Sequence, residues 1–423
     1  MSTARIPLGR AWGVARALVD AMRDRASEIT PVGSLRRFDA TVGDISLLAV
    51  TSSAAKFFDD VAAILGIKVL DRTATTILVE FEREQVTFHA TPPESAGAAL
   101  FWHTGSRAHT CELGRRAGNR ALEISALGIR SLKSDQFLTT HSEEQVYDLL
   151  GLPFIAPELR EGQGEVEAAD AGALPVLVES PDIRGDLHMH SSWSDGADDI
   201  AAMVTQSVAL GYEYIAITDH SQSSGGAGGL TVERLQRQRR EVEEVRQRFP
   251  NITIFHGAEV DILPDGQLDY PDSVLADLDI VLASLHDRAG QGGSQLTDRY
   301  LRAIRHPLVH IITHPTNRLV GYRPGYNLDL PRLFEAAVET GTVLEIDGAP
   351  AHLDMDGALT RRAIADGAMV SINSDSHRAE WLKRQMTFGV ATARRGWAEP
   401  GHVLNTRPLT ELRDVLARKR SKA

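Results

Sequence analysis

The chain of 423 residues contains a single cysteine, Cys111, so it cannot form an intramolecular disulfide. This scarcity favours a reducing compartment, where thiols stay reduced. Long apolar runs are missing too: none approaches the roughly 18 residues that a membrane-spanning helix needs. The first residues also lack the apolar core of a secretory signal. We therefore expect a cytoplasmic protein without membrane contact.

Positive charge is also in deficit. The formal net charge of −12 argues against a strongly basic DNA-binding protein, because affinity for phosphates comes mainly from lysine and arginine. Most of the acidic excess and most of the 15 histidines lie after residue 165. Carboxylates and imidazoles that accumulate together are typical of sites for divalent cations.

The length and the hydrophobic fraction of 43% predict a globular protein of two or three domains. Residues 1–98 mix helical and strand-like patterns, and a smaller, mostly helical unit is predicted over residues 99–165. Residues 166–183, rich in alanine, acid and proline, are interpreted as a linker.

A regular alternation of strand-like and helical segments begins at residue 184 and continues through the C-terminal part, 184–423. This α/β pattern predicts a parallel sheet that closes into a barrel of seven βα repeats. The strand-like runs lie near residues 184–190, 213–219, 252–260, 279–285, 308–313, 342–347 and 368–374.

Histidines and acids stand at the C-terminal ends of six of the seven runs; the run at 342–347 is the one without a predicted ligand. The first and seventh runs each carry two such residues at i and i+2, a spacing that points both side chains to one side. Barrel enzymes build their active sites at this end of the strands. Because the set exceeds what one ion needs, we expect two or three divalent ions. The candidate ligands are His188, His190, Asp195, His220, Glu259, His286, His314, Asp375 and His377.

Arg318 follows His314 in the same loop, and a guanidinium beside cations could orient a phosphate group. We therefore predict that Arg318 is a catalytic residue. Asp261, Asp265 and Asp269 match a calcium-binding loop only loosely, and a turn is expected there.

The motifs around the candidate ligands resemble those of the PHP (polymerase and histidinol phosphatase) domain. These motifs are HMHSSWSDG, TDHS, GAEVDILPDGQLDYPD, SLH, THPTNRL and NSDSH. The following MTFGVATARRGW resembles the PHP domain of bacterial family X DNA polymerases in particular. The resemblance spans residues 184–423 and implies a distorted (βα)7 barrel with three divalent metal ions, usually Mn or Zn.

The same resemblance implies a partition of the nine ligands in which Glu259 bridges two ions. The first ion would be held by His188, His190, Glu259 and Asp375, the second by Glu259, His286 and His314, and the third by Asp195, His220 and His377.

The first 165 residues resemble the palm and thumb of these polymerases, a nucleotidyltransferase-like α+β domain followed by a small subdomain. GSLRRFDATVGDISLLAV is similar to the palm signature, FWHTGSRAH to the palm-thumb junction, and GLPFIAPELREGQGE to the end of the thumb. Of the three aspartates in the palm pattern only Asp44 is present, because Ser46 and Thr87 stand at the other two positions.

Nucleotidyl transfer needs two Mg²⁺ ions clamped between carboxylates, and one aspartate with two hydroxyl residues holds them poorly. The chain also begins at the palm, without the lyase and fingers regions. We therefore predict that polymerase activity is lost.

These features lead to the hypothesis of a metal-dependent phosphoesterase that acts on DNA 3′ ends in DNA repair. It would serve as a 3′→5′ exonuclease, as a 3′-phosphatase or in abasic-site processing, with cations activating water for attack on phosphorus. The acidic barrel leaves open a small-molecule phosphatase of histidinol-phosphate or nucleotide type. A non-catalytic DNA-binding or assembly protein is a third alternative, against which the full set of ligands argues.

Overall fold

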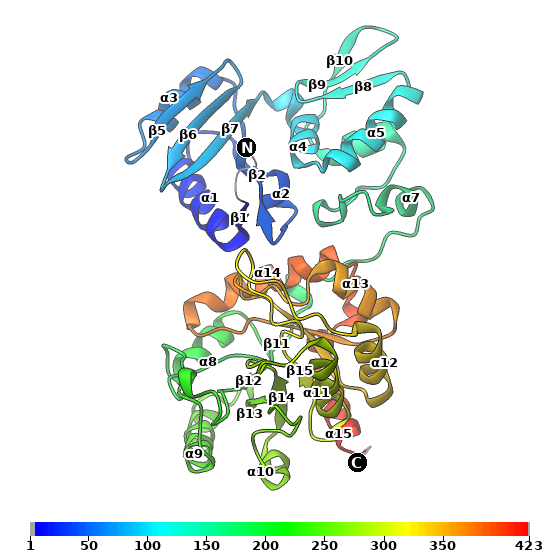
Figure 1. Ribbon diagram of the computed structural model, residues 1–423. Coiled ribbons are helices and arrows are strands. Elements are labelled where there is room, and N and C mark those ends of the chain that lie inside the picture. The colour runs from blue at the N-terminus through cyan, green and yellow to red at the C-terminus, as the bar shows by residue number, and fades with distance from the viewer. Residues whose placement is uncertain (1–4, 422–423) are drawn as a thin grey trace. The chain divides into compact units, whose positions relative to one another are not determined.

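The computed structural model describes residues 5–421, and the chain divides after Leu174 into two compact units. Each unit has its own sheets and its own buried core, and each is described separately (Figure 1). Within the described residues, no helix is both long enough and apolar enough to cross a membrane.

A five-stranded mixed sheet forms the first part of the N-terminal unit. Its strands, in spatial order, are β2 (Glu28–Val32), β4 (Ile45–Val50), β7 (Glu84–Thr91), β6 (Thr76–Phe81) and β5 (Lys68–Arg72). The apolar run of β4 is almost wholly buried and pairs in parallel with β7, which places it inside the sheet. The accompanying elements are β1 (Ile6–Pro7), α1 (Leu8–Met22), α2 (Gly33–Arg36), β3 (Thr41–Val42) and α3 (Ala54–Ala62).

The second part of this unit contains a small sheet that the prediction of a mostly helical unit missed. Its antiparallel strands are β8 (Leu122–Ser125), β9 (Gly128–Ser131) and β10 (Gln136–Leu138). Each strand has only three or four residues, several of them exposed, so no alternating apolar pattern marks them. The helices are α4 (Ala96–Thr104), α5 (Arg107–Asn119), α6 (Glu143–Leu150) and α7 (Glu165–Asp170), the last of which extends into the segment expected to be a linker.

The C-terminal unit is a nearly closed barrel of seven parallel strands in sequence order, as the alternation predicts. An isolated parallel bridge between Met189 and Ser376 joins the first strand to the last. The strands are β11 (Gly185–Asp186), β12 (Tyr214–Ile217), β13 (Thr253–Asp261), β14 (Ile280–Ser284), β15 (Ile311–Ile312), β16 (Val343–Asp347) and β17 (Val370–Asn373).

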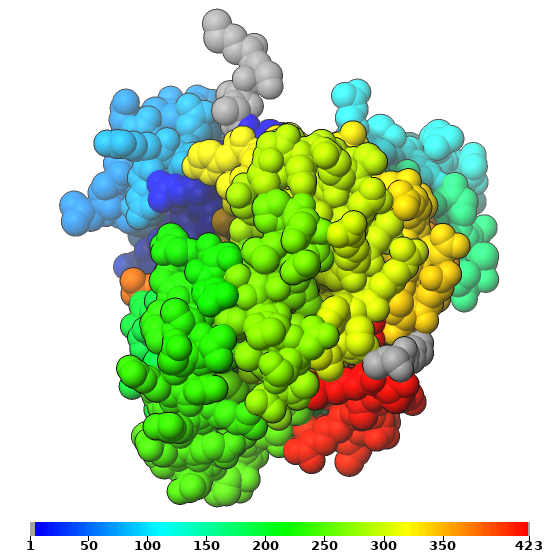
Figure 2. All heavy atoms as spheres, turned by 60° about the horizontal axis from the view of Figure 1, so that its bottom comes forward, coloured from blue at the N-terminus to red at the C-terminus, as the bar shows by residue number. Residues whose placement is uncertain are grey.

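Helices cover the outside of the barrel. They are α8 (Ile200–Ala209), α9 (Val232–Arg248), α10 (Asp272–Asp277), α11 (Gly293–Arg305), α12 (Leu330–Thr340), α13 (Gly357–Ala365), α14 (Leu382–Arg395) and α15 (Leu409–Arg420). In Figure 2 the visible face of this unit consists mainly of the green to yellow part of the chain, with α15 in red at its edge.

The N-terminal end of the barrel is closed by an apolar cluster. Leu187, Tyr214 and Ile280 from the strands pack there with Leu412 and Leu416 of α15. These apolar side chains are buried, so no polar site opens at that end. The polar groups that follow the strands lie at the opposite, C-terminal end.

The first prediction concerns Gly185, where β11 pairs closely with Tyr214 of β12. A Cβ atom on Gly185 would lie 2.1 Å from the carbonyl oxygen of Tyr214 and 2.3 Å from its ring. Gly185→Ala should therefore destabilise the barrel by about 1–3 kcal/mol or more, as overpacking does in other cores. Urea unfolding of the full chain measures the effect. The matched control is Gly401→Ala, whose new Cβ meets no heavy atom within 4 Å; equal stability of both variants would contradict the prediction.

Candidate metal centre

The nine residues predicted from the strand ends lie in one cluster at the C-terminal end of the barrel. Each has a side-chain nitrogen or oxygen within 4.0 Å of such an atom in at least one of the others. Most of them lie two to four residues beyond the end of a strand, and Glu259 lies within β13.

Glu259 is at the centre of the cluster and is only 1% exposed. Its Oε2 lies 2.8 Å from Nδ1 of His220 and 3.6 Å from Nε2 of His188. Its Oε1 lies 2.8 Å from Nε2 of His314 and 3.4 Å from Nε2 of His286. One carboxylate therefore reaches histidines from four other strand ends, as a bridging ligand requires.

His188, His190 and Asp375 form one group that fits a divalent cation. Nδ1 of His188 donates to Glu345, which leaves its Nε2 facing the cluster, only 3.1 Å from Nε2 of His190. Oδ1 of Asp375 is 3.0 Å from the same nitrogen of His190. Two imidazole nitrogens and a carboxylate that converge in this way are typical metal ligands. The buried Nδ1 atoms of His190 and His314 have no hydrogen-bond partner among the described residues.

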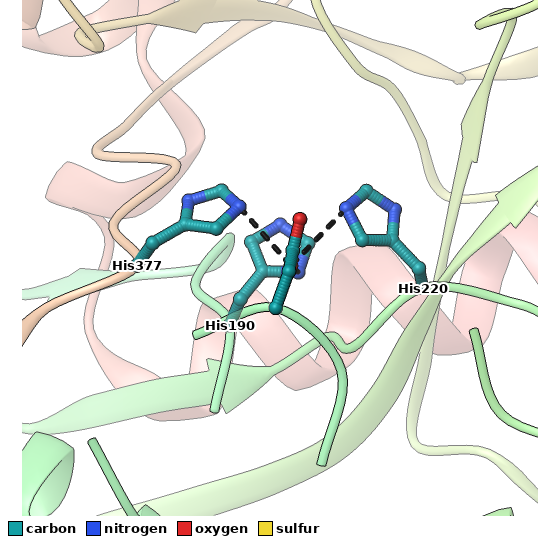
Figure 3. Close-up of side chains that lie close together, drawn as sticks. His190, His220 and His377 are labelled. Atoms are coloured by element: carbon teal, nitrogen blue, oxygen red, sulfur yellow. Dashed lines mark ion pairs between the residues drawn. The ribbon is translucent and has the colours of Figure 1, made fainter. Parts of the chain in front are cut away.

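A second group gathers around Asp195, where His377, His190 and His220 turn toward one another (Figure 3). Nε2 of His377 and Nε2 of His220 lie 3.3 Å and 3.6 Å from Oδ1 of Asp195. His220 also belongs to a third group with Glu259 and His286. The geometry thus brings together the sets implied by the resemblance, but His190 and His220 are each close to two of them.

The charges of these side chains depend on one another. Burial alone would raise the pKa of Glu259, but His220, His286 and His188 outweigh it and hold that pKa well below its usual value. Burial, together with His220 and His377, lowers the pKa of His190 to about 3. Glu259 is therefore ionised and His190 neutral. Burial alone would lower the pKa of His220, but Glu259 and Asp195 outweigh it and raise that pKa well above its usual value, so this ring must lose a proton when a cation binds.

Two of the candidate ligands have an unusual backbone. His314 and Asp375 have φ angles of 22° and 48°, in a region that non-glycine residues rarely occupy. Such strain is concentrated at functional sites, where the surrounding structure compensates for it.

A surrounding layer of acids, which the sequence reasoning missed, orients the histidines. Glu345 accepts hydrogen bonds from Nδ1 of His188 at 2.8 Å and from the backbone N–H of His314 at 2.7 Å. Asp261 accepts from Nδ1 of His286 at 2.7 Å, so it has a role beyond the expected turn. These contacts fix the tautomer of each ring, so that its other nitrogen faces the cluster.

No ligand was predicted on the sixth strand, yet β16 contains both Glu345 and Asp347. The period-two rule that identified the first and seventh runs would have found them, because they are also at i and i+2. Both carboxylates are fully buried. Burial, Asp375 and Glu345 together raise the pKa of Asp347 well above its usual value.

A cavity of about 400 Å³ opens onto the cluster. Seven of the candidate ligands line it, together with His352 and the loop residues 223–227. His188 and His190 are fully buried. A ligand in the cavity would therefore meet the cluster from one side only.

Arg318 is not among the residues that line this cavity. Its Nε donates to the carbonyl of His352 at 2.8 Å, and its Nη1 pairs with Asp356 at 3.1 Å. Its Nη2 donates to the carbonyl of Leu353. These contacts favour a positioning role in the loop that carries His352, while the phosphate-binding role stays a prediction.

The three palm positions also come together, in the N-terminal unit. Ser46 on β4 pairs in register with Thr87 on β7, and the Ser46 hydroxyl donates to Asp44 at 2.5 Å. Beside them the rings of His89 and His103 lie with centroids 4.0 Å apart and planes inclined by 31°, a contact that the sequence did not reveal. The position therefore holds a single carboxylate where the palm pattern has three.

Comparison with known proteins agrees with both parts of the chain. Residues 99–161 match the DNA polymerase beta thumb, and residues 186–314 match the PHP domain. The fold and the cluster of ligands define a metal-dependent hydrolase of the PHP type that carries a polymerase thumb.

The chain is 38% identical over 420 residues to the DNA polymerase/3′-5′ exonuclease PolX of Bacillus subtilis. The matched region covers 98% of this chain and 73% of that protein. It therefore belongs to the PolX family. Two probable phosphatases match less than half of the chain. The phosphatase of Syntrophotalea carbinolica is 32% identical over 206 residues, which cover 46% of this chain and 80% of the phosphatase. The phosphatase of Caldanaerobacter subterraneus subsp. tengcongensis is 29% identical over 209 residues, which cover 45% of this chain and 75% of the phosphatase.

The second prediction tests the layer around the ligands. Glu345→Gln replaces the acceptor of His188 by an amide that can also donate, and so loosens the orientation of both His188 and His314. The affinity for Mn²⁺ should fall by about 10- to 100-fold, the usual effect of losing such a partner. Isothermal titration with Mn²⁺ measures it. Glu335→Gln, on the exposed face of α12, is the matched control and should bind as the wild type does; an unchanged affinity in Glu345→Gln would contradict this role.

Proposed function

We propose that the barrel hydrolyses phosphoesters at DNA 3′ ends, and that the nine clustered residues hold its divalent ions. The observation that carries this proposal is the cluster itself, which lies at the open end of a PHP barrel in a chain that also has a polymerase thumb. The PolX relative from Bacillus subtilis is named as a DNA polymerase/3′-5′ exonuclease, and the similarity to it extends along 98% of this chain.

Divalent ions supply Lewis-acid activation of water and of phosphoester oxygens at neutral pH. The residues of the chain arrange this chemistry. Glu259 contacts histidines on both sides and can bridge two ions, while Glu345 and Asp261 hold His188 and His286 in the required tautomers. We propose three ions, with Mn or Zn favoured because imidazole and carboxylate ligands are mixed.

The same site could serve a small phosphoester, and the charge of the chain favours this second candidate. The net charge of −12 weakens tight binding of DNA. In the N-terminal unit, Arg36 and Arg37 are occupied by ion pairs with Glu143 and Glu161. The match to the probable phosphatases also extends over 75% and 80% of their own length, which supports this candidate.

We further propose that the palm has lost polymerase activity. Support comes from the pair of hydroxyl residues, Ser46 and Thr87, beside the single carboxylate of Asp44. Two Mg²⁺ ions at a transferring phosphate need several carboxylate oxygens, and one aspartate supplies too few.

The third prediction tests the metal site. His188→Ala combined with His190→Ala should reduce hydrolysis to the background rate and lower the number of bound ions, because both rings present nitrogen ligands to the cluster. Initial rates with Mn²⁺ and elemental analysis of the loaded protein are the measurements. A double replacement outside the cluster, His306→Ala with His402→Ala, controls for the loss of two histidines. Full activity in the His188/His190 variant would remove the proposed mechanism.

Substrate preference is decided by a panel assayed with Mn²⁺, Zn²⁺ and Mg²⁺. It contains a recessed DNA 3′ end, a 3′-phosphorylated primer, an abasic duplex, histidinol phosphate and nucleoside monophosphates. The proposal expects turnover of the DNA substrates to exceed that of the small esters in kcat/KM. Turnover of the small esters alone would support the phosphatase instead, and DNA binding without hydrolysis would favour the non-catalytic alternative.

The fourth prediction concerns the palm. Templated primer extension with Mg²⁺ or Mn²⁺ should give no incorporation of dNTPs. The matched variant is Asp44→Asn, which removes the remaining carboxylate. Incorporation by the wild type that disappears in Asp44→Asn would show an active palm and refute the proposed loss.

A further inference from the structure

Two side chains beside the nine-residue cluster, Asp347 and His352, form an additional group of ligand atoms with Asp375 of the cluster. Asp347 ends β16, His352 lies in the loop that follows, and Asp375 comes after β17. Each offers a nitrogen or oxygen within 4.8 Å of those of the other two. Asp347 and His352 have no part in the three-ion arrangement proposed above.

Two polar atoms of this group lack partners. Asp347 is fully buried; its Oδ1 accepts the backbone N–H of Ala349 at 2.6 Å, but its Oδ2 has no hydrogen-bond partner among the described residues. Nδ1 of His352 is likewise buried and without a partner there. Buried polar atoms are nearly always satisfied in folded proteins, so an unpaired carboxylate oxygen and an unpaired imidazole nitrogen point to a ligand.

The charge around these atoms selects the chemistry of that ligand. Asp347 and Asp375 are two buried acids in one small group, with Glu345 also nearby on the same strand. An anion would add to their repulsion, whereas a cation relieves it. One imidazole with two carboxylates is a donor set that suits Mn²⁺ or Zn²⁺.

The loop that carries His352 is held in place, so the group does not depend on a flexible segment. Arg318 donates to the carbonyl of His352 at 2.8 Å, and Thr316 donates from its backbone N–H to Asp354 at 2.8 Å. The His352 ring stacks on that of His314, with centroids 5.3 Å apart and planes inclined by 23°. Both His352 and Asp375 line the cavity.

We propose that Asp347, His352 and Asp375 bind a divalent cation in addition to those held by the nine-residue cluster, with Asp375 shared between the two sites. Because two of its three ligands line the cavity, a phosphoester bound there can complete the coordination. The site does not depend on which phosphoester is the substrate. It gives Arg318 a positioning role, that of holding the backbone of the His352 loop.

The test counts ions in the full chain. Protein stripped with a chelator is reloaded with Mn²⁺, freed of excess ion, and analysed for bound manganese per chain. His352→Gln should bind one ion fewer than the wild type, and so should Asp347→Asn. His306→Gln replaces a histidine outside the cluster and should bind as many ions as the wild type.

Asp347 is buried within a strand and its variant could fold poorly, so His352→Gln, in a partly exposed loop, keeps the test decisive. Equal manganese content in His352→Gln and the wild type would overturn the additional site. The His188→Ala/His190→Ala variant separates this failure from that of the proposed function. If it alone loses ions, the main centre stands and the additional site is refuted; if it retains them all, the proposed function fails instead.

Discussion

Glu259 places a carboxylate at the centre of the barrel, 1% exposed, and the rest of the C-terminal unit depends on how its charge is balanced. A buried and uncompensated carboxylate costs several kcal/mol, so positive charge must come from close by. His188, His220, His286 and His314 converge on it from four other strand ends. The C-terminal ends of these strands must therefore lie at the same level of the barrel. Apolar side chains close the opposite end, so the polar side chains gather at the C-terminal end.

The ligand positions could be predicted because residues at the C-terminal ends of parallel strands, far apart in the sequence, lie together at one end of the barrel. A histidine after a strand needs no alignment with its neighbour, since all the C-terminal ends face the same way. Glu345 and Asp347 were missed although they stand at i and i+2 at the end of the sixth run, the spacing used for the first and seventh runs. What that spacing does not give is the role of Glu345, which follows from its partners, His188 and the His314 backbone.

Fold prediction succeeded where burial is continuous and failed where it is not. The strands β12 and β14 are apolar and buried throughout, so their sequence alone marks them as interior parallel strands. The β8–β10 sheet has short strands with exposed residues, so no alternating apolar pattern marks it in the sequence. The sheet contacts α4 and α5, and such tertiary contacts are not visible in the sequence of the strands. Arg318 shows the same limit, because its partners Leu353 and Asp356 lie more than 30 residues further along the chain.

The N-terminal unit has hydroxyl side chains at two positions where the palm pattern has carboxylates. In register, Ser46 and Thr87 face each other across β4 and β7. Two carboxylates at these positions would repel each other and Asp44 unless cations were bound, whereas a hydroxyl donates to Asp44 instead. On the proposed loss of polymerase activity, the exchange removes the need for metal ions at this position, and the Ser46 hydroxyl supplies a hydrogen bond to Asp44 in their place.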